Sequence, residues 1–143
     1  MKISCDLSEL DKITYGLHKK LFAQIIEGID LPVTPSHIYL LNYLKNQHEC
    51  MMTDISNYLG VTLGAVTSLV DRLYDFGLVC RERSEVDRRL VMIRLSVDGE
   101  ELLKRIDKRR QEIFNYYLQD MDEEEILYLS KVTEKIIAKI LNS

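Results

Sequence analysis

The sequence has no long apolar run, and this absence limits where the protein can reside. None of its apolar stretches approaches the roughly 20 residues that a membrane-spanning helix requires. Residues 1–6 become polar immediately after the initiating methionine, which is not the pattern of a secretory signal peptide. We therefore expect a cytoplasmic protein without a membrane partner.

Cysteine and histidine are also scarce. The three cysteines are an odd number, widely spaced and without a CxxC pair, which excludes a disulfide framework and a zinc knuckle. The three histidines lie in separate segments, and His48-x-Cys50 is too short a set for a metal site. No acid, base and nucleophile converge in the sequence. We therefore expect no enzymatic activity, no cofactor and no metal.

Positive charge is in the minority, which at first disfavours nucleic acid as a partner. The chain has 19 basic and 23 acidic residues and a formal net charge of −4. Residues 1–71 and 95–143 each carry a net charge of −3, whereas residues 72–94 hold six arginines against four acids. Only this basic segment, residues 72–94, is suited to bind phosphate.

Two short helices with a tight turn between them precede this basic segment. Residues 53–59 are long enough for two helical turns, and residues 63–76 form a second helical run. Gly60 suits the left-handed position that ends a helix, and Thr62 can cap the next one. The pattern predicts a helix-turn-helix, whose second helix enters the major groove of DNA. Its core is predicted to consist of Ile55, Leu59, Val61, Val66, Leu69, Val70 and Leu73.

The periodicity changes from helical to alternating after Gly77. Residues 78–83 and 90–95 are rich in apolar and β-branched side chains, and the polar residues 84–89 lie between them. They predict an antiparallel hairpin with a charged tip, against which residues 50–52 could add a short strand. A helix-turn-helix followed directly by such a hairpin is a winged helix. We therefore predict a mainly α-helical fold with a small β-wing.

The motifs in this region resemble the MarR family of multiple-antibiotic-resistance regulators. The resemblance rests on the turn 59–62, on Val70-Asp71-Arg72-Leu73 with Gly77-Leu78-Val79, and on Asp87-x-Arg89 followed by residues 91–99. It implies a homodimeric regulator of transcription, most often a repressor, that binds a pseudo-palindrome in double-stranded DNA. It also implies release of the DNA by a small phenolic or otherwise lipophilic effector.

The ends of the chain are predicted to be helical and amphipathic. Asp6 and Glu9 are placed as a capping box for a helix to about Gly28, Thr34 and Pro35 begin a second, and Ser96 begins a third that reaches about Asp120. The last helix begins at Asp122, and its apolar stripe consists of Ile126, Leu129, Val132, Ile136 and Ile140. We expect one domain over residues 1–143, in which residues 30–97 bind DNA and residues 1–29 and 98–143 form a helical dimerisation region.

Two sets of site residues follow. The exposed face of the second helix, its cap and the hairpin tip give the expected DNA contacts: Thr62, Leu63, Gly64, Thr67, Ser68, Arg72, Asp87, Arg88 and Arg89. By the resemblance, Arg89 enters the minor groove, Asp87 orients its guanidinium group, and Arg88 binds phosphate. The resemblance also implies a ligand pocket between the first, second and fifth helices, lined by Tyr15, His18, Phe22, His37 and Leu41.

Two alternatives remain open. A redox-responsive regulator would need a reactive cysteine; Cys5 and Cys50 are expected to be exposed but have no adjacent cationic cluster, and Cys80 is expected to lie in the core. The second alternative is a winged helix used for protein–protein interaction. The Asp87-x-Arg89 tip favours DNA, because a protein-binding module does not require it.

Overall fold

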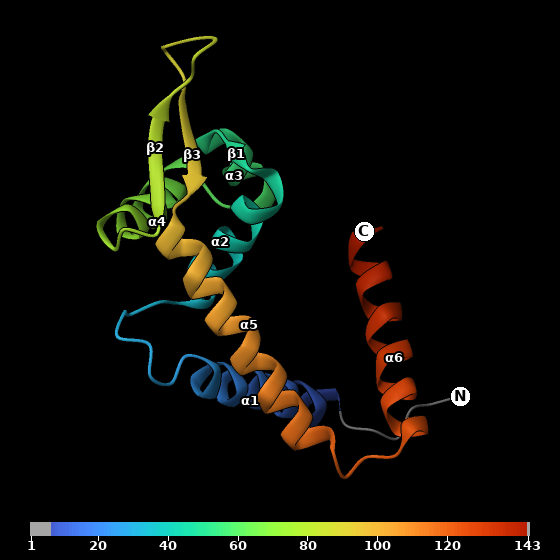
Figure 1. The fold of residues 1–143 in the computed structure, drawn as a ribbon. Coiled ribbons are helices and arrows are strands. Elements are labelled where there is room, and N and C mark those ends of the chain that lie inside the picture. Colours follow the sequence, from blue (N-terminus) through green and yellow to red (C-terminus); the bar gives the residue numbers. More distant parts are fainter. Residues whose placement is uncertain (1–6, 143) are drawn as a thin grey trace. The chain divides into compact units, whose positions relative to one another are not determined.

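The computed structural model describes residues 7–142. Within them the chain forms six helices and three strands (Figure 1). In chain order these are α1 (Leu7–Ile25), α2 (Pro35–Gln47), β1 (Glu49–Cys50), α3 (Met52–Leu59), α4 (Leu63–Asp75), β2 (Val79–Arg83), β3 (Val91–Leu95), α5 (Val97–Leu118) and α6 (Glu123–Leu141). The predicted winged helix with flanking helices is confirmed. No described helix is both long and apolar enough to cross a membrane.

The helices begin and end where local side chains satisfy the free backbone groups. The hydroxyl of Thr34 accepts a hydrogen bond from the backbone of His37 at the start of α2, and Asp122 does the same for Glu125 at the start of α6. Ser96 accepts from the Gly99 amide at 3.0 Å, as predicted for the start of α5. The predicted cap at Asp6 lies outside the described residues.

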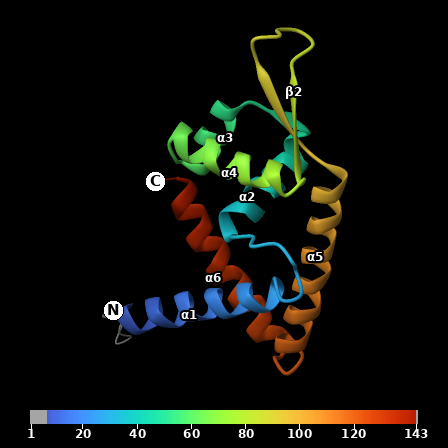
Figure 2. The ribbon, with the colours of Figure 1, turned by 90° about the vertical axis from the view of Figure 1, so that its left-hand side faces the viewer.

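The three strands form one antiparallel sheet in the order β1-β3-β2. The short strand β1 comprises Glu49 and Cys50, whereas the sequence predicts a strand over residues 50–52. The difference arises because the Met51 amide donates a hydrogen bond to the Asp54 carboxylate at 2.8 Å, so α3 already begins at Met52. The hairpin of β2 and β3 extends beyond α3 and α4, with its loop at the outer end (Figures 1 and 2).

A small core joins α2, α3 and α4 to the sheet. Its fully buried side chains include Ile55, Val66, Val70 and Leu73, as predicted, and Ile93 of the central strand. Val61, a predicted member of this core, is instead 39% exposed. The reason is the turn itself: the Ser56 hydroxyl donates to the Val61 carbonyl at 2.6 Å, which holds residue 61 at the surface.

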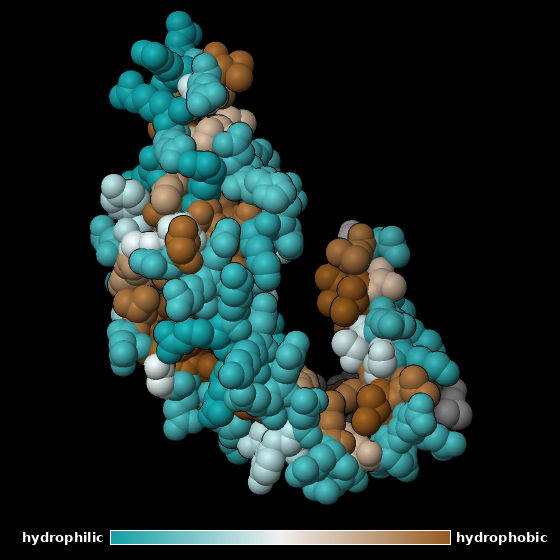
Figure 3. Space-filling model, viewed as in Figure 1, coloured by the Kyte–Doolittle hydropathy of each residue, from teal (hydrophilic) through white to brown (hydrophobic). Residues whose placement is uncertain are grey.

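The chain separates into two compact units, residues 1–108 and 109–143, and α5 runs from the first into the second. The second unit contains the end of α5 and all of α6. Its apolar stripe of five residues, predicted from the sequence, is present on α6 but is exposed throughout. Figure 3 shows apolar atoms along this helix. A helix with so much exposed apolar surface is typical of one that packs against another element.

Candidate nucleic-acid interface

Helix α4 has a buried face and an exposed face. Val66, Val70 and Leu73 are fully buried and fix the helix to the core. The opposite face exposes Leu63, Gly64, Thr67, Ser68 and Arg72, as predicted. The Thr62 hydroxyl caps the helix by accepting from the Ala65 amide at 3.3 Å. The helix therefore presents a nearly uncharged surface of small and hydroxyl-bearing side chains.

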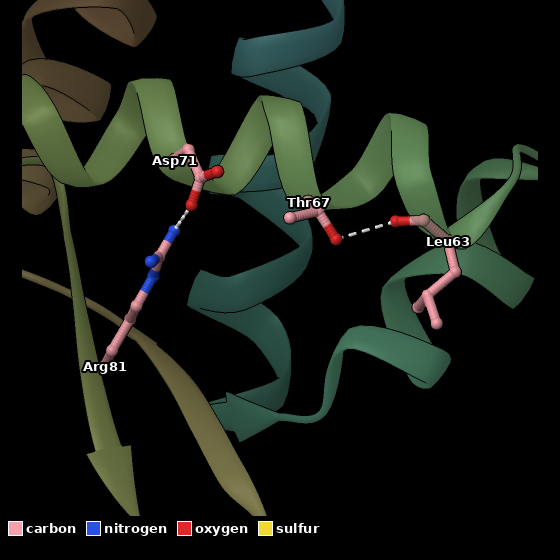
Figure 4. A network of polar contacts seen from close by, with 4 residues as sticks. All are labelled: Leu63, Thr67, Asp71 and Arg81. Atoms are coloured by element: carbon pink, nitrogen blue, oxygen red, sulfur yellow. Dashed lines mark hydrogen bonds and ion pairs between the residues drawn. The ribbon is translucent and has the colours of Figure 1, made fainter.

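One of these hydroxyl groups is already engaged. The Thr67 hydroxyl donates to the Leu63 carbonyl at 2.9 Å (Figure 4). Because a hydroxyl has one proton and two lone pairs, Thr67 can still accept a hydrogen bond, and its methyl group remains available for apolar contact. Ser68 is exposed as well. Thr67 is thus suited to accept from a base amino group or to contact a thymine methyl group.

The turn before α4 sets the angle between the two helices. Gly60 has a φ of +66°, in the left-handed region that favours glycine, and its amide donates to the Ser56 carbonyl at 3.0 Å. This confirms the predicted end of α3. The turn contains no charged side chain.

The hairpin tip is held by hydrogen bonds from its backbone amides to side-chain acceptors within the tip. The Ser84 hydroxyl accepts from the amides of Val86 at 3.2 Å and Asp87 at 3.3 Å. The Asp87 carboxylate accepts from the Arg89 amide at 3.0 Å. This differs from the expected ion pair with the Arg89 guanidinium group: Asp87 fixes the backbone of the tip, and the side chains of Arg88 and Arg89 extend from it exposed.

Two arginines of the basic segment are neutralised within the protein. Arg81 of β2 forms an ion pair with Asp71 of α4 (Figure 4). Its guanidinium group also lies over the Tyr74 ring, 4.9 Å from the ring centroid. Arg94 of β3 pairs with Glu82 of β2. The Asp71–Arg81 pair joins the wing to α4, and it is not predictable from the sequence because no periodicity relates residues ten apart in different elements.

The remaining arginines of this segment are Arg72, Arg83, Arg88 and Arg89. All four are exposed, and within residues 7–142 none has an ion-pair partner. They lie on α4, at the end of β2 and at the hairpin tip. Unpaired guanidinium groups beside an uncharged helix face are suited to phosphates, with the helix face left for base edges.

Known proteins are similar to this chain in sequence and fold. A profile of the MarR family matches residues 31–90, which run from the linker before α2 through the hairpin tip. The HTH-type transcriptional repressor MdtR of Bacillus subtilis is 27% identical over 131 residues, covering 91% of this chain and 84% of MdtR. A solved MarR family protein from Bacillus stearothermophilus is 26% identical with a TM-score of 0.76, covering 94% of this chain and 95% of its own. The chain is therefore similar to MarR family proteins in sequence and fold.

The YusO protein of Bacillus subtilis, another solved structure, is 26% identical with a TM-score of 0.73 and covers 92% of this chain and 94% of its own. These likenesses extend beyond the winged helix to the terminal helices. Together with the exposed α4 face and the unpaired arginines, these similarities support a DNA-binding regulator of transcription.

The five residues expected to form a MarR-type ligand pocket differ in their accessibility. Tyr15 and His18 are exposed on α1, and Phe22 is half-buried. His37 and Leu41 are buried in α2 at 2% and 0% exposure, so a ligand could reach them only after a rearrangement. A separate open recess of about 310 Å³ is lined by residues 29–31, Phe76, Leu78 and the start of α5.

His37 has a structural role in α2. Its Nδ1 accepts a hydrogen bond from the Thr34 amide at 3.0 Å, which completes the capping box, and its ring meets the Phe76 ring edge-on at 6.2 Å between centroids. Nε2 is buried and has no partner among the described residues. Burial, followed by the positive charge of Arg72, lowers the pKa of His37.

The cysteines differ from expectation. Cys50 is buried rather than exposed, because it forms part of β1 against β3. Burial, followed by the Asp54 carboxylate, raises its pKa to about 11, so it is a thiol at neutral pH. Cys80 is half-buried rather than in the core, and Cys5 lies outside the described residues. No cluster of three metal-ligating side chains occurs in the described part of the chain.

Proposed function

We propose that the protein is a homodimeric, effector-responsive repressor that binds a pseudo-palindromic operator. The observation that carries this proposal is that two features occur together. The exposed face of α4 is nearly uncharged, and the hairpin tip, held by its own hydrogen bonds, bears arginines without ion-pair partners. The similar protein MdtR is named a transcriptional repressor, which supports repression rather than activation. Cytoplasmic location and the absence of catalysis belong to this proposal.

In this proposal α4 lies in the major groove. Leu63, Gly64, Thr67 and Ser68 contact base edges, while Arg72 and the helix amide groups near Thr62 hold phosphates. Arg89 enters the adjacent minor groove, where negative potential concentrates, and Arg88 binds phosphate beside it. Asp87 supports both by holding the loop backbone. Few base contacts per protomer mean that specificity requires two protomers.

The second protomer is proposed to bind through the terminal helices. Leu10, Ile13 and Leu17 of α1 are 48–59% exposed, and every residue of α6 is exposed. Burying these apolar side chains is favourable, and a second copy of the chain offers the same apolar surface for a two-fold symmetric interface. We assign residues 1–29 and 98–143 to dimerisation and residues 30–97 to DNA binding.

An effector is proposed to be small and phenolic or otherwise lipophilic. Tyr15, His18, Phe22, His37 and Leu41 would contact it after a rearrangement that exposes His37 and Leu41. The two alternatives have less support. A cysteine switch at Cys50 is opposed by its raised pKa, and a protein-binding module does not account for the unpaired arginines at the tip.

Titration of a fluorescent duplex of mixed sequence at several salt concentrations tests this function. We expect binding that weakens steeply as salt rises, because several phosphates are neutralised. A stoichiometry of two protomers per duplex is expected at saturation. Binding that is absent at low salt, or that does not depend on salt, would contradict the proposal.

A further inference from the structure

The hairpin has two faces, and the Asp71–Arg81 ion pair shows which of them is turned toward α4. Successive side chains of a strand point to opposite faces. Because Arg81 reaches Asp71 of α4, Val79 and Arg83 lie on that same face of β2. The cross-strand partner of Arg81 is Ile93, which is fully buried in the core. The α4-facing side of the hairpin therefore continues outward from the core to Arg83.

Arg83 lies where this face leaves the core. It is the last residue of β2 and pairs across the hairpin with Val91, which is 43% exposed. Arg81, two residues closer to the core, is neutralised by Asp71, whereas Arg83 is exposed and has no ion pair within residues 7–142. Arg83 thus lies between α4 and the hairpin tip, and its positive charge has no ion-pair partner among the described residues.

The geometry points to a phosphate contact. In the proposed docking, α4 occupies the major groove and the tip occupies the adjacent minor groove, and one sugar–phosphate backbone separates two such grooves. We propose that Arg83 binds a phosphate of this separating backbone and so sets the distance between helix and wing on the duplex. The inference rests on the proposed function and adds a contact to it. Phosphate contacts position a protein without reading sequence.

The substitution Arg83→Gln tests this contact against a matched control, Arg94→Gln. Each removes one positive charge from the same hairpin, but Arg94 pairs with Glu82 and lies on the opposite face. The probe is a duplex of mixed sequence, and the readout is the slope of log affinity against log salt. We expect Arg83→Gln to reduce the slope by about one per protomer and Arg94→Gln to leave it unchanged. Arg83→Lys should restore the wild-type slope, because a lysine also neutralises a phosphate.

The outcomes separate the two proposals. Absence of wild-type binding would overturn the proposed function and the Arg83 contact with it. Normal wild-type binding with an unchanged slope in Arg83→Gln, or equal losses in Arg83→Gln and Arg94→Gln, would overturn the Arg83 contact alone. Thermal melting confirms that each variant is folded. If Arg83→Gln melts below the wild type, Arg83→Met, which keeps an unbranched apolar stem, is measured in its place.

Discussion

Arg88 and Arg89 are neighbours at the hairpin tip, and their substitutions should have different effects. Arg89→Ala should weaken operator binding by about 1–3 kcal/mol and reduce the preference for narrow A·T-rich flanks, because arginine favours the negative potential of a narrow minor groove. Arg88→Ala should weaken all sequences alike and lower the salt slope by about one per protomer, as expected for a phosphate contact. Affinity for operator and random duplex across a salt series distinguishes the two.

Asp87→Ala should resemble a mild form of Arg89→Ala. The arginine side chain remains, but its amide loses the carboxylate acceptor at 3.0 Å, and the loop becomes less constrained. All three variants must first be shown to be folded and dimeric. Wild-type affinity and specificity in Arg89→Ala would remove the wing from the mechanism.

His37 should make the stability of the fold depend on pH. Its pKa is lowered in the folded state by burial and by Arg72, so the unfolded chain takes up the proton first as pH falls. The free energy of unfolding should therefore be unaffected by this group above about pH 7 and should fall below the ordinary histidine pKa of about 6.5, by at most about 1.4 kcal/mol per pH unit. Urea denaturation at a series of pH values measures it.

His37→Gln is the matched control, because glutamine at the third helical position also completes a capping box but does not titrate. The stability of the wild type relative to His37→Gln should decrease as pH falls from 7 to 5, because only the wild type loses stability through this group. A constant difference over this range would show that His37 is not the group responsible.

At the scale of the helices, alanine substitutions at two glycines should have opposite effects on stability. A Cβ atom added at Gly99, in the first turn of α5, would lie 2.2 Å from the Leu78 carbonyl oxygen, whereas at Gly64 of α4 it would meet nothing within 4 Å. Gly99→Ala should therefore destabilise the fold by more than about 1 kcal/mol, because a backbone atom must move. Gly64→Ala should leave stability unchanged or slightly higher.

The variants Gly99→Ala and Gly64→Ala also distinguish an effect on folding from an effect on DNA binding. Gly64→Ala adds a methyl group to the proposed base-contacting face, so operator affinity should change while the melting temperature does not fall. Denaturation and duplex titration of both variants provide the measurement. A Gly99→Ala protein as stable as the wild type would contradict the close packing of α5 against Leu78, the residue before β2.

Elements whose ends depend on local chemistry are predictable from the sequence. Gly60, Thr62 and Ser96 end or begin helices through contacts with residues at most four away, and alternation is enough to locate β2 and β3. The features that escape prediction depend on tertiary packing. The pairing of Asp71 with Arg81, the burial of Cys50 in a two-residue strand, and the inaccessible His37 all depend on which elements meet. The proposed DNA and ligand contacts stay predictions.

For the whole molecule, the proposed role of the apolar stripe of α6 in dimerisation leads to a prediction about the oligomeric state. Deleting residues 126–143 should give a monomer or an aggregating protein, because the proposed partner helices lose their cover. Light scattering of the full-length and truncated proteins at matched concentration measures this. A soluble truncated dimer would refute the assignment of α6 to the interface.

Selection of binding sites from a random duplex library tests the central proposal most directly, since the selection itself yields the operator sequence. If two copies of α4 read DNA across a two-fold axis, the enriched sequences should contain inverted half-sites about one helical turn apart, flanked by A·T-rich positions where Arg89 enters the minor groove. Enrichment of a single unsymmetrical site, or no enrichment above the starting library, would contradict the proposal.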